Sequence, residues 1–151
     1  MSPAYPHLLV NHLPVAGALV ASILLAVAVR RQTLEGAVYG YVALIATALL
    51  AIVAFVSGNF APPALDGVPG VSRDHITFHQ ITALATMIVS VLAGLLAAIP
   101  LVLTNIATRR GVLIAYLVVS IGLDAAFAFT ASTGGAIRHT EFCLLYTSRC
   151  V

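Results

Sequence analysis

Little of this sequence is charged. Only 8% of the 151 residues are Asp, Glu, Lys or Arg, whereas a soluble domain carries about a quarter of such residues. Lysine and tryptophan are absent, and seven arginines stand against five acidic residues. So little charge cannot cover a water-facing globule, and the sequence has no basic stripe with interleaved aromatic residues to bind nucleic acid. A soluble domain and a nucleic-acid-binding protein are therefore excluded.

Cysteine is scarce as well, and both copies fall in the last nine residues, CLLYTSRCV. This ending resembles the translation of a transposon-end adapter used in library preparation. We therefore interpret Cys143 to Val151 as a tail foreign to the natural protein, which leaves the native sequence after Phe142 open. The two cysteines then say nothing about the redox compartment.

Apolar residues are in large excess. They make up 61% of the chain, and the mean hydropathy is +1.08. A helix that crosses a membrane needs about 20 apolar residues, and helices are expected because lipid offers no partner to an open backbone. Four segments have this length, at about residues 8–29, 37–57, 76–103 and 112–133. The predicted fold class is therefore all-α, with residues 1–142 forming one up-down-up-down bundle of four transmembrane helices.

Two arginine doublets predict the orientation of this bundle. Arg30-Arg31 follows the first span and Arg109-Arg110 precedes the fourth, and short cytoplasmic loops carry the excess of basic residues. We therefore predict a multi-pass protein of the bacterial inner membrane, embedded in the lipid bilayer, with both termini outside the cytoplasm. A homo-oligomer is left open.

In this topology all five histidines gather at the non-cytoplasmic end of the bundle. They are His7, His12, His75, His79 and His139. Helix rise puts His12 and His79 at similar depths on diagonal helices, and axial histidines hold the iron of b-type haem. The leading hypothesis is haem b bound between His12 and His79. His139 is the next candidate ligand, and Arg73 or Arg138 would pair with the haem propionates.

Two other interpretations of these histidines stay open. Neutral imidazole also suits copper and zinc, so a non-haem metal site would use His7, His12, His75 and His79. The simplest alternative is that the histidines only form hydrogen bonds with helix ends and loops. His75 and His79 have the spacing of a metalloprotease motif but lack its glutamate, and we expect no stand-alone catalytic activity.

Asp124 is an exception within the fourth span. A carboxylate inside the membrane is costly and by default marks a function or a partner. It extends a line with Tyr116 and Ser120, and a proton path toward the histidines is one interpretation. The other is a carboxyl that fastens two helices by hydrogen bonds. The candidate partners are Thr82, Thr86 and Ser90.

Short motifs follow one another in a characteristic order. They are Asn11-His12-Leu13-Pro14, Ser57-Gly58-Asn59, His75 with His79-Gln80, and the segment from Gly134-Gly135 through Arg138-His139 to Glu141. Together they resemble the bacterial four-helix membrane proteins grouped as domain of unknown function 2231, over nearly all of Tyr5 to Phe142.

That resemblance implies no settled activity. Proteins of this family look like modules found beside or fused to cytochrome c domains, which modestly favours a redox role. The matching positions are His12, Gly58, His79, Gly135, Arg138 and His139. Asn59 and Gln80 stand where acidic residues are expected in close relatives, so any metal or proton role of those acids is in doubt here.

Three functions therefore remain. The first is a b-haem-binding or electron-transfer membrane subunit with a periplasmic redox or cytochrome partner. The second is a cofactor-free structural or assembly subunit that docks a periplasmic partner. The third is a proton or small-solute pathway through Asp124.

Overall fold

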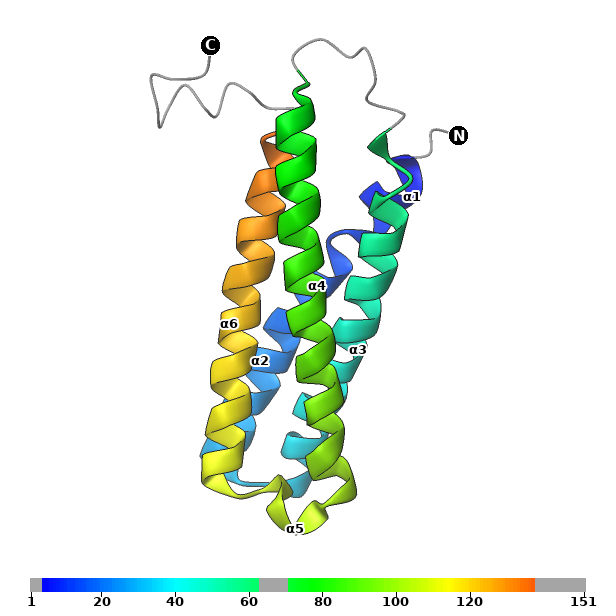
Figure 1. Cartoon of the computed structure of the whole chain (residues 1–151). Helices are drawn as coiled ribbons and strands as arrows, with labels where there is room; N and C mark the ends of the chain where they lie inside the picture. The colour runs from blue at the N-terminus through cyan, green and yellow to red at the C-terminus, as the bar shows by residue number, and fades with distance from the viewer. Residues whose placement is uncertain (1–3, 63–70, 138–151) are drawn as a thin grey trace, which may run out of the picture.

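The computed structural model describes residues 4–62 and 71–137, and within these ranges the chain is helical, with no strand (Figure 1). The four long helices are α2 (Leu13–Arg31), α3 (Leu34–Gly58), α4 (Arg73–Val102) and α6 (Arg110–Gly135), and the two short ones are α1 (Ala4–Val10) and α5 (Thr104–Ala107). The predicted all-α four-helix bundle is confirmed. The tail from Cys143 to Val151, and with it Arg138 and His139, lies outside the described residues.

Each long helix is long and apolar enough to cross a membrane, and α1 and α2 together make up the first span, Tyr5–Arg31. Large apolar side chains are exposed on the outward faces of these helices. Examples are Leu19, Leu49, Leu95 and Val118. Such faces are stable against lipid chains, which are as apolar as leucine. The protein is therefore a small multi-pass membrane protein.

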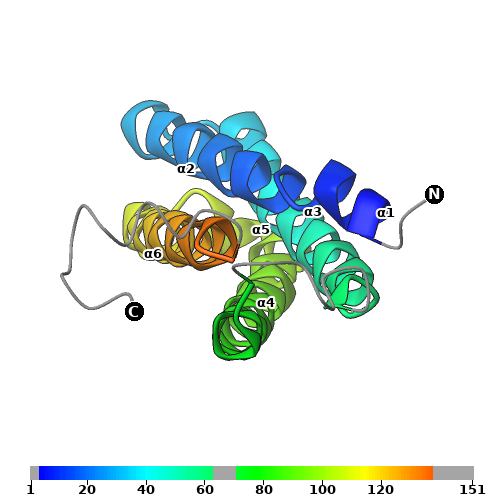
Figure 2. The same cartoon turned by 90° about the horizontal axis from the view of Figure 1, so that it is seen from above.

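The four long helices form a closed ring. α2 packs on α3, α3 on α4, α4 on α6, and α6 returns to α2, so that α2 and α4 are diagonal (Figure 2). α1, the end of α3, the start of α4 and the end of α6 lie at one end of the bundle, here called the histidine end because it carries His7, His12, His75 and His79 (Figure 1). The opposite, arginine end carries Arg30, Arg31, Arg109 and Arg110. The predicted gathering of the histidines is thus confirmed for the four that are described.

Small residues bring these helices close together. Alanines are frequent among the fully buried residues, including Ala18, Ala21 and Ala97. Gly94 of α4 lies directly against Ala48 of α3, where an added Cβ would stand 2.7 Å from the Ala48 Cβ. This packing of small residues is typical of helices that associate in lipid, where van der Waals contact replaces the hydrophobic effect.

The first span departs from the expected continuous helix. It is interrupted at Asn11 and His12, between α1 and α2. Pro14 stands in the first turn of α2, and because proline has no N–H and its ring clashes with the carbonyl four residues earlier, a helix cannot run unchanged through it. α1 instead packs against α3. This change of direction brings His7 to the end of α3.

Tyr41 ties the short helix α5 to the bundle. Its hydroxyl donates to the Ala107 carbonyl at 2.8 Å, and the side chain is 0% exposed.

Changing Tyr41→Phe leaves that carbonyl without its partner, and we expect a loss of about 1 kcal/mol in the free energy of unfolding. Thermal unfolding in detergent measures the loss. Tyr39→Phe, at an exposed position of the same helix, should leave the unfolding temperature unchanged; equal effects of both changes would contradict the prediction.

Candidate functional site

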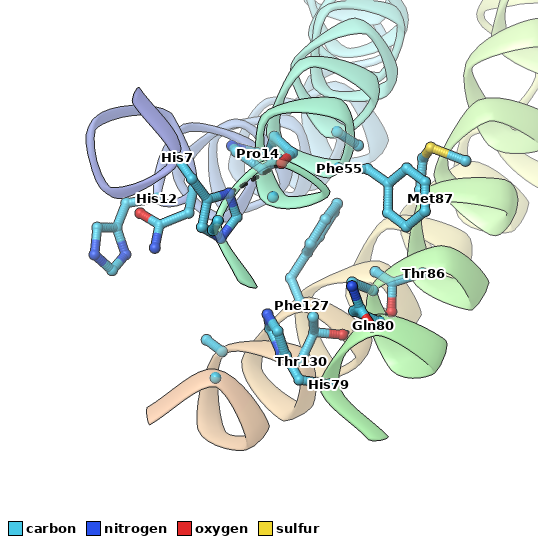
Figure 3. Close-up of a pocket in the computed structure, with 18 of the residues that line it drawn as sticks. His7, His12, Pro14, Phe55, His79, Gln80, Thr86, Met87, Phe127 and Thr130 are labelled. Carbon is cyan, nitrogen blue, oxygen red and sulfur yellow. Dashed lines mark hydrogen bonds between the residues drawn. The ribbon is translucent and has the colours of Figure 1, made fainter. Parts of the chain in front are cut away.

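A cavity of about 500 Å³ lies at the histidine end. All four long helices and α1 contribute to its wall, which is mostly apolar and includes Pro14, Phe55, Met87 and Phe127 (Figure 3). The volume is within the range of small-molecule and cofactor sites, which are also mainly apolar with a few polar groups. The polar groups here are three imidazoles, amide side chains and threonine hydroxyls.

His7 reaches this cavity from α1. Its Nδ1 lies 3.0 Å from the Ala54 carbonyl oxygen and 3.3 Å from Ser57 Oγ, both near the end of α3. The ring rests on Gly58, where an added Cβ would lie 3.0 Å from the His7 Cε1. Because a carbonyl oxygen can only accept, Nδ1 must carry the proton and donate it to Ala54.

His79 reaches the cavity from α4 in a closely similar way. Its Nδ1 lies 3.0 Å from Thr133 Oγ1 on α6, and a Cβ added at Gly134 would stand 2.9 Å from its Cε1. The Thr133 hydroxyl donates its own proton to the Thr130 carbonyl at 2.8 Å. Since a hydroxyl has one proton, Thr133 accepts from His79, and Nδ1 of His79 is also the protonated nitrogen.

The two histidines therefore form a matched pair. Each ring lies on a glycine that follows a hydroxyl residue, Ser57-Gly58 for His7 and Thr133-Gly134 for His79. Both rings point into the same space (Figure 3). The hydrogen bonds to Ala54, Ser57 and Thr133 all use Nδ1 of the two rings. In the neutral state both Nε2 atoms keep a lone pair that a ligand can use.

The other predicted site residues lie around this pair. His12 lines the cavity but is exposed, and its ring points away from the rings of His7 and His79 (Figure 3). Gly58, Asn59 and Gly135 also line the cavity. Arg73 is exposed at the first residue of α4. The pairing of His12 with His79 stays a prediction, although His7 is the better placed partner.

The alternative of a protein-only metal centre has less support. Within residues 4–62 and 71–137 no group of three histidine, cysteine or acidic side chains is arranged to hold a metal ion. His75 does not line the cavity, and its Nδ1 is buried without a partner among the described residues. The set of His7, His12, His75 and His79 is therefore spread over the histidine end and is not gathered around one point.

Asp124 lies outside the cavity, and its partner differs from the expected ones. Ser22 of α2 donates to Asp124 Oδ2 at 2.6 Å, whereas Thr86 pairs with Thr130 and Thr82 with Thr133. The reason is helical rotation. At 3.6 residues per turn, positions six and nine residues apart on a helix are separated by about 240° and 180°, so Asp124 faces α2 where Thr130 and Thr133 face α4. The line of Thr82, Thr86 and Ser90 does face protein, as predicted.

The chain is thus a four-helix membrane protein. Its histidine-bearing cavity is a candidate ligand site near one membrane surface. No protein-family model, no curated protein and no solved structure matches the chain. The resemblance to domain of unknown function 2231 stays a prediction.

The sequence named His7 only for the alternative metal site, and it did not reveal the contact between Gly134 and His79. The helix interruption that turns His7 inward is signalled by Pro14, but its direction depends on the packing of α1 against α3. Gly134 contacts His79, whereas an added Cβ at the neighbouring Gly135 would meet nothing within 4 Å. One residue along a helix is a rotation of about 100°, which a short motif does not define.

Proposed function

We propose that this membrane protein binds haem b in the cavity at the histidine end and transfers electrons, and that His7 and His79 are the residues that would hold the haem iron. The observation that carries the proposal is the matched pair of imidazoles, each with Nδ1 hydrogen-bonded and each lining the same mainly apolar cavity. Haem, when bound, would supply a one-electron carrier.

The donor set favours haem over a bare metal ion. A porphyrin already provides four nitrogen ligands, so the protein needs to add only two axial groups, and histidine is a common choice. A bare ion needs three or more protein ligands, and the described residues offer no such group. Hydrogen bonds from Nδ1–H to a carbonyl and to a hydroxyl orient both rings and raise the basicity of Nε2.

The position of the cavity also suits an amphipathic ring. Its apolar wall continues into the bundle through Met87 and Phe127, while Arg73 stands at the start of α4, at the same end of the bundle. We assign Arg73 to the propionates; Arg138, the other candidate, lies outside the described residues. A haem edge near this surface would exchange electrons with a redox or cytochrome partner outside the cytoplasm.

The optical spectrum of purified protein titrated with haem tests this proposal. Wild-type protein should give the Soret band of six-coordinate, bis-histidine haem. His7→Ala and His79→Ala should each abolish that spectrum by removing an axial ligand. His75→Ala is the matched control, since this residue is one turn from His79 but does not line the cavity, and it should bind haem as the wild type does.

His12→Ala separates the two possible ligand pairs. We expect it to keep the bis-histidine spectrum, because the His12 ring points away from the other two imidazoles. Loss of the spectrum in His12→Ala but not in His7→Ala would replace His7 by His12 as the ligand. A folded wild-type protein that binds no haem would refute the proposal and favour the structural or assembly subunit.

A further inference from the structure

A series of polar side chains continues from the cavity into the apolar middle of the bundle. At the histidine end, Thr133 Oγ1 lies 3.0 Å from His79 Nδ1 and 3.2 Å from Thr82 Oγ1. One turn deeper, Thr86 and Thr130 form a second pair at 2.9 Å between α4 and α6. Both pairs cross from one helix to the other, which a haem site alone does not require.

Ser90 on α4 and Asp124 on α6 are the next buried polar groups toward the centre, and Asp124 faces α2. Ser90 follows Thr86 by one turn, is 0% exposed, and its Oγ has no hydrogen-bond partner among the described residues. Asp124 binds Ser22 through Oδ2 at 2.6 Å, while its Oδ1 is buried and unpartnered within the same part of the chain. A buried polar atom without a partner is costly and calls for a bound molecule, and a water would satisfy such a site.

The series goes on toward the arginine end. Ser22 lies 3.0 Å from Ser120, whose hydroxyl donates to the Leu117 carbonyl at 2.9 Å. The next turn of α6 brings Tyr116, which donates to the Leu96 carbonyl at 2.6 Å. Its ring centroid lies 5.0 Å from that of Tyr41, and Tyr41 reaches the Ala107 carbonyl beside the arginine doublet. We call the whole set, from His79 to Tyr41, the polar seam.

The hydrogen bonds around Asp124 suit a group that gains and loses a proton. The chain from the carboxyl through Ser22 and Ser120 to the Leu117 carbonyl has three links. The two hydroxyls supply only two protons, since each serine has one. When the carboxyl carries a proton, Asp124 donates to Ser22 and Ser22 donates to Ser120, so all three hydrogen bonds are formed. When that proton leaves, the Ser22 hydroxyl rotates and donates to Asp124. No other acidic or basic residue lies in the middle of a described span.

We propose that the polar seam is a proton pathway between the two ends of the bundle, with Asp124 as its central proton-transfer residue. A proton enters from water at the histidine end, passes the hydroxyl pairs to the Asp124 carboxyl, and leaves through Ser22 and Ser120 toward the arginine end, with water bridging the steps between groups that no hydrogen bond joins. Water bound at Ser90 and at Asp124 Oδ1 bridges the central step. One proton enters for each that leaves, so no co-reactant is needed.

Proton flux into liposomes tests the pathway, using haem-free full-length protein and a pH-sensitive dye inside the vesicles. A potassium diffusion potential set by valinomycin supplies the driving force. Wild-type protein should acidify the interior faster than protein-free liposomes do. Asp124→Asn keeps the shape of the side chain but cannot carry the proton, and it should return the flux to the protein-free rate. Asp74→Asn, at an exposed acid in the first turn of α4, should keep the wild-type flux.

Two further variants probe the seam on either side of Asp124. Ser22→Ala and Thr86→Val remove one hydroxyl each, and both should lower the flux while circular dichroism shows the helices intact. A wild-type flux equal to that of protein-free liposomes would overturn the proposal, as would an undiminished flux in Asp124→Asn. An Asp124→Asn protein with normal flux and a lower unfolding temperature would show that the carboxyl only fastens α2 to α6. None of these outcomes depends on haem binding.

Discussion

Replacing Gly94 with leucine should push α3 away from α4 and strongly destabilise the bundle. The Cβ of any larger residue would start 2.7 Å from the Ala48 Cβ, with the Ile45 Cα and the Leu44 carbonyl oxygen both at 3.5 Å. These neighbours are backbone atoms and a methyl group, which cannot rotate away. Overpacking usually costs about 1–3 kcal/mol, and we expect the Gly94→Leu change to reach or exceed the upper end of that range because two whole helices must move apart.

The matched control is Gly122→Leu. Gly122 is an exposed glycine within α6, and an added Cβ there meets no atom within 4 Å. Leucine is a better helix former than glycine by nearly 1 kcal/mol, so this variant should be as stable as the wild type or slightly more so. Unfolding by heat in detergent, followed by circular dichroism, measures both proteins. Similar midpoints for the two variants would show that α3 and α4 do not pack through Gly94.

The helices themselves could be predicted because a membrane span is recognised from the composition of a short stretch of sequence. The segments 37–57 and 112–133 fall inside α3 and α6, since an apolar stretch of membrane length bounded by polar residues has few other stable forms. The gathering of His7, His12, His75 and His79 at one end follows from the same counting, because alternate helices reverse direction. Such arguments use only distance along the chain.

Contacts between helices could not be predicted in the same way, because they depend on which way each side chain points around its axis. Depth along the chain favours His12 as a ligand, whereas the interruption before α2 brings His7 to the end of α3 and the His12 ring points away from His7 and His79, although His12 still lines the cavity (Figure 3). Asp124 was expected to bind a hydroxyl on α4, and its partner is Ser22 on α2. Both differences arise from the rotation of each helix about its own axis and from the direction of α1. A single sequence whose spans differ little in polarity from face to face does not determine either of them.

The adjacent glycines at the end of α6 offer the sharpest test of the site. An alanine at Gly134 would put its Cβ 2.9 Å from Cε1 and 3.3 Å from Nδ1 of His79, so the ring must shift and its hydrogen bond to Thr133 must lengthen. Losing the support of a ligating histidine typically costs ten- to a hundredfold in affinity. We expect Gly134→Ala to weaken haem binding by about tenfold or more.

Gly135→Ala is a control for the support of His79, because a Cβ there meets nothing within 4 Å, and it should leave the hydrogen bond between His79 and Thr133 unchanged. Nitrogen-15 chemical shifts of the His79 ring give a second measurement that needs no haem. They should report an altered Nδ1–H hydrogen bond in Gly134→Ala and the wild-type bond in Gly135→Ala. If the ring shifts change in Gly134→Ala while the haem affinity does not, His79 is held as described but is not a ligand. If neither changes, the contact between His79 and Gly134 does not position the ring. The glycine beside each imidazole then has no part in holding that imidazole in place.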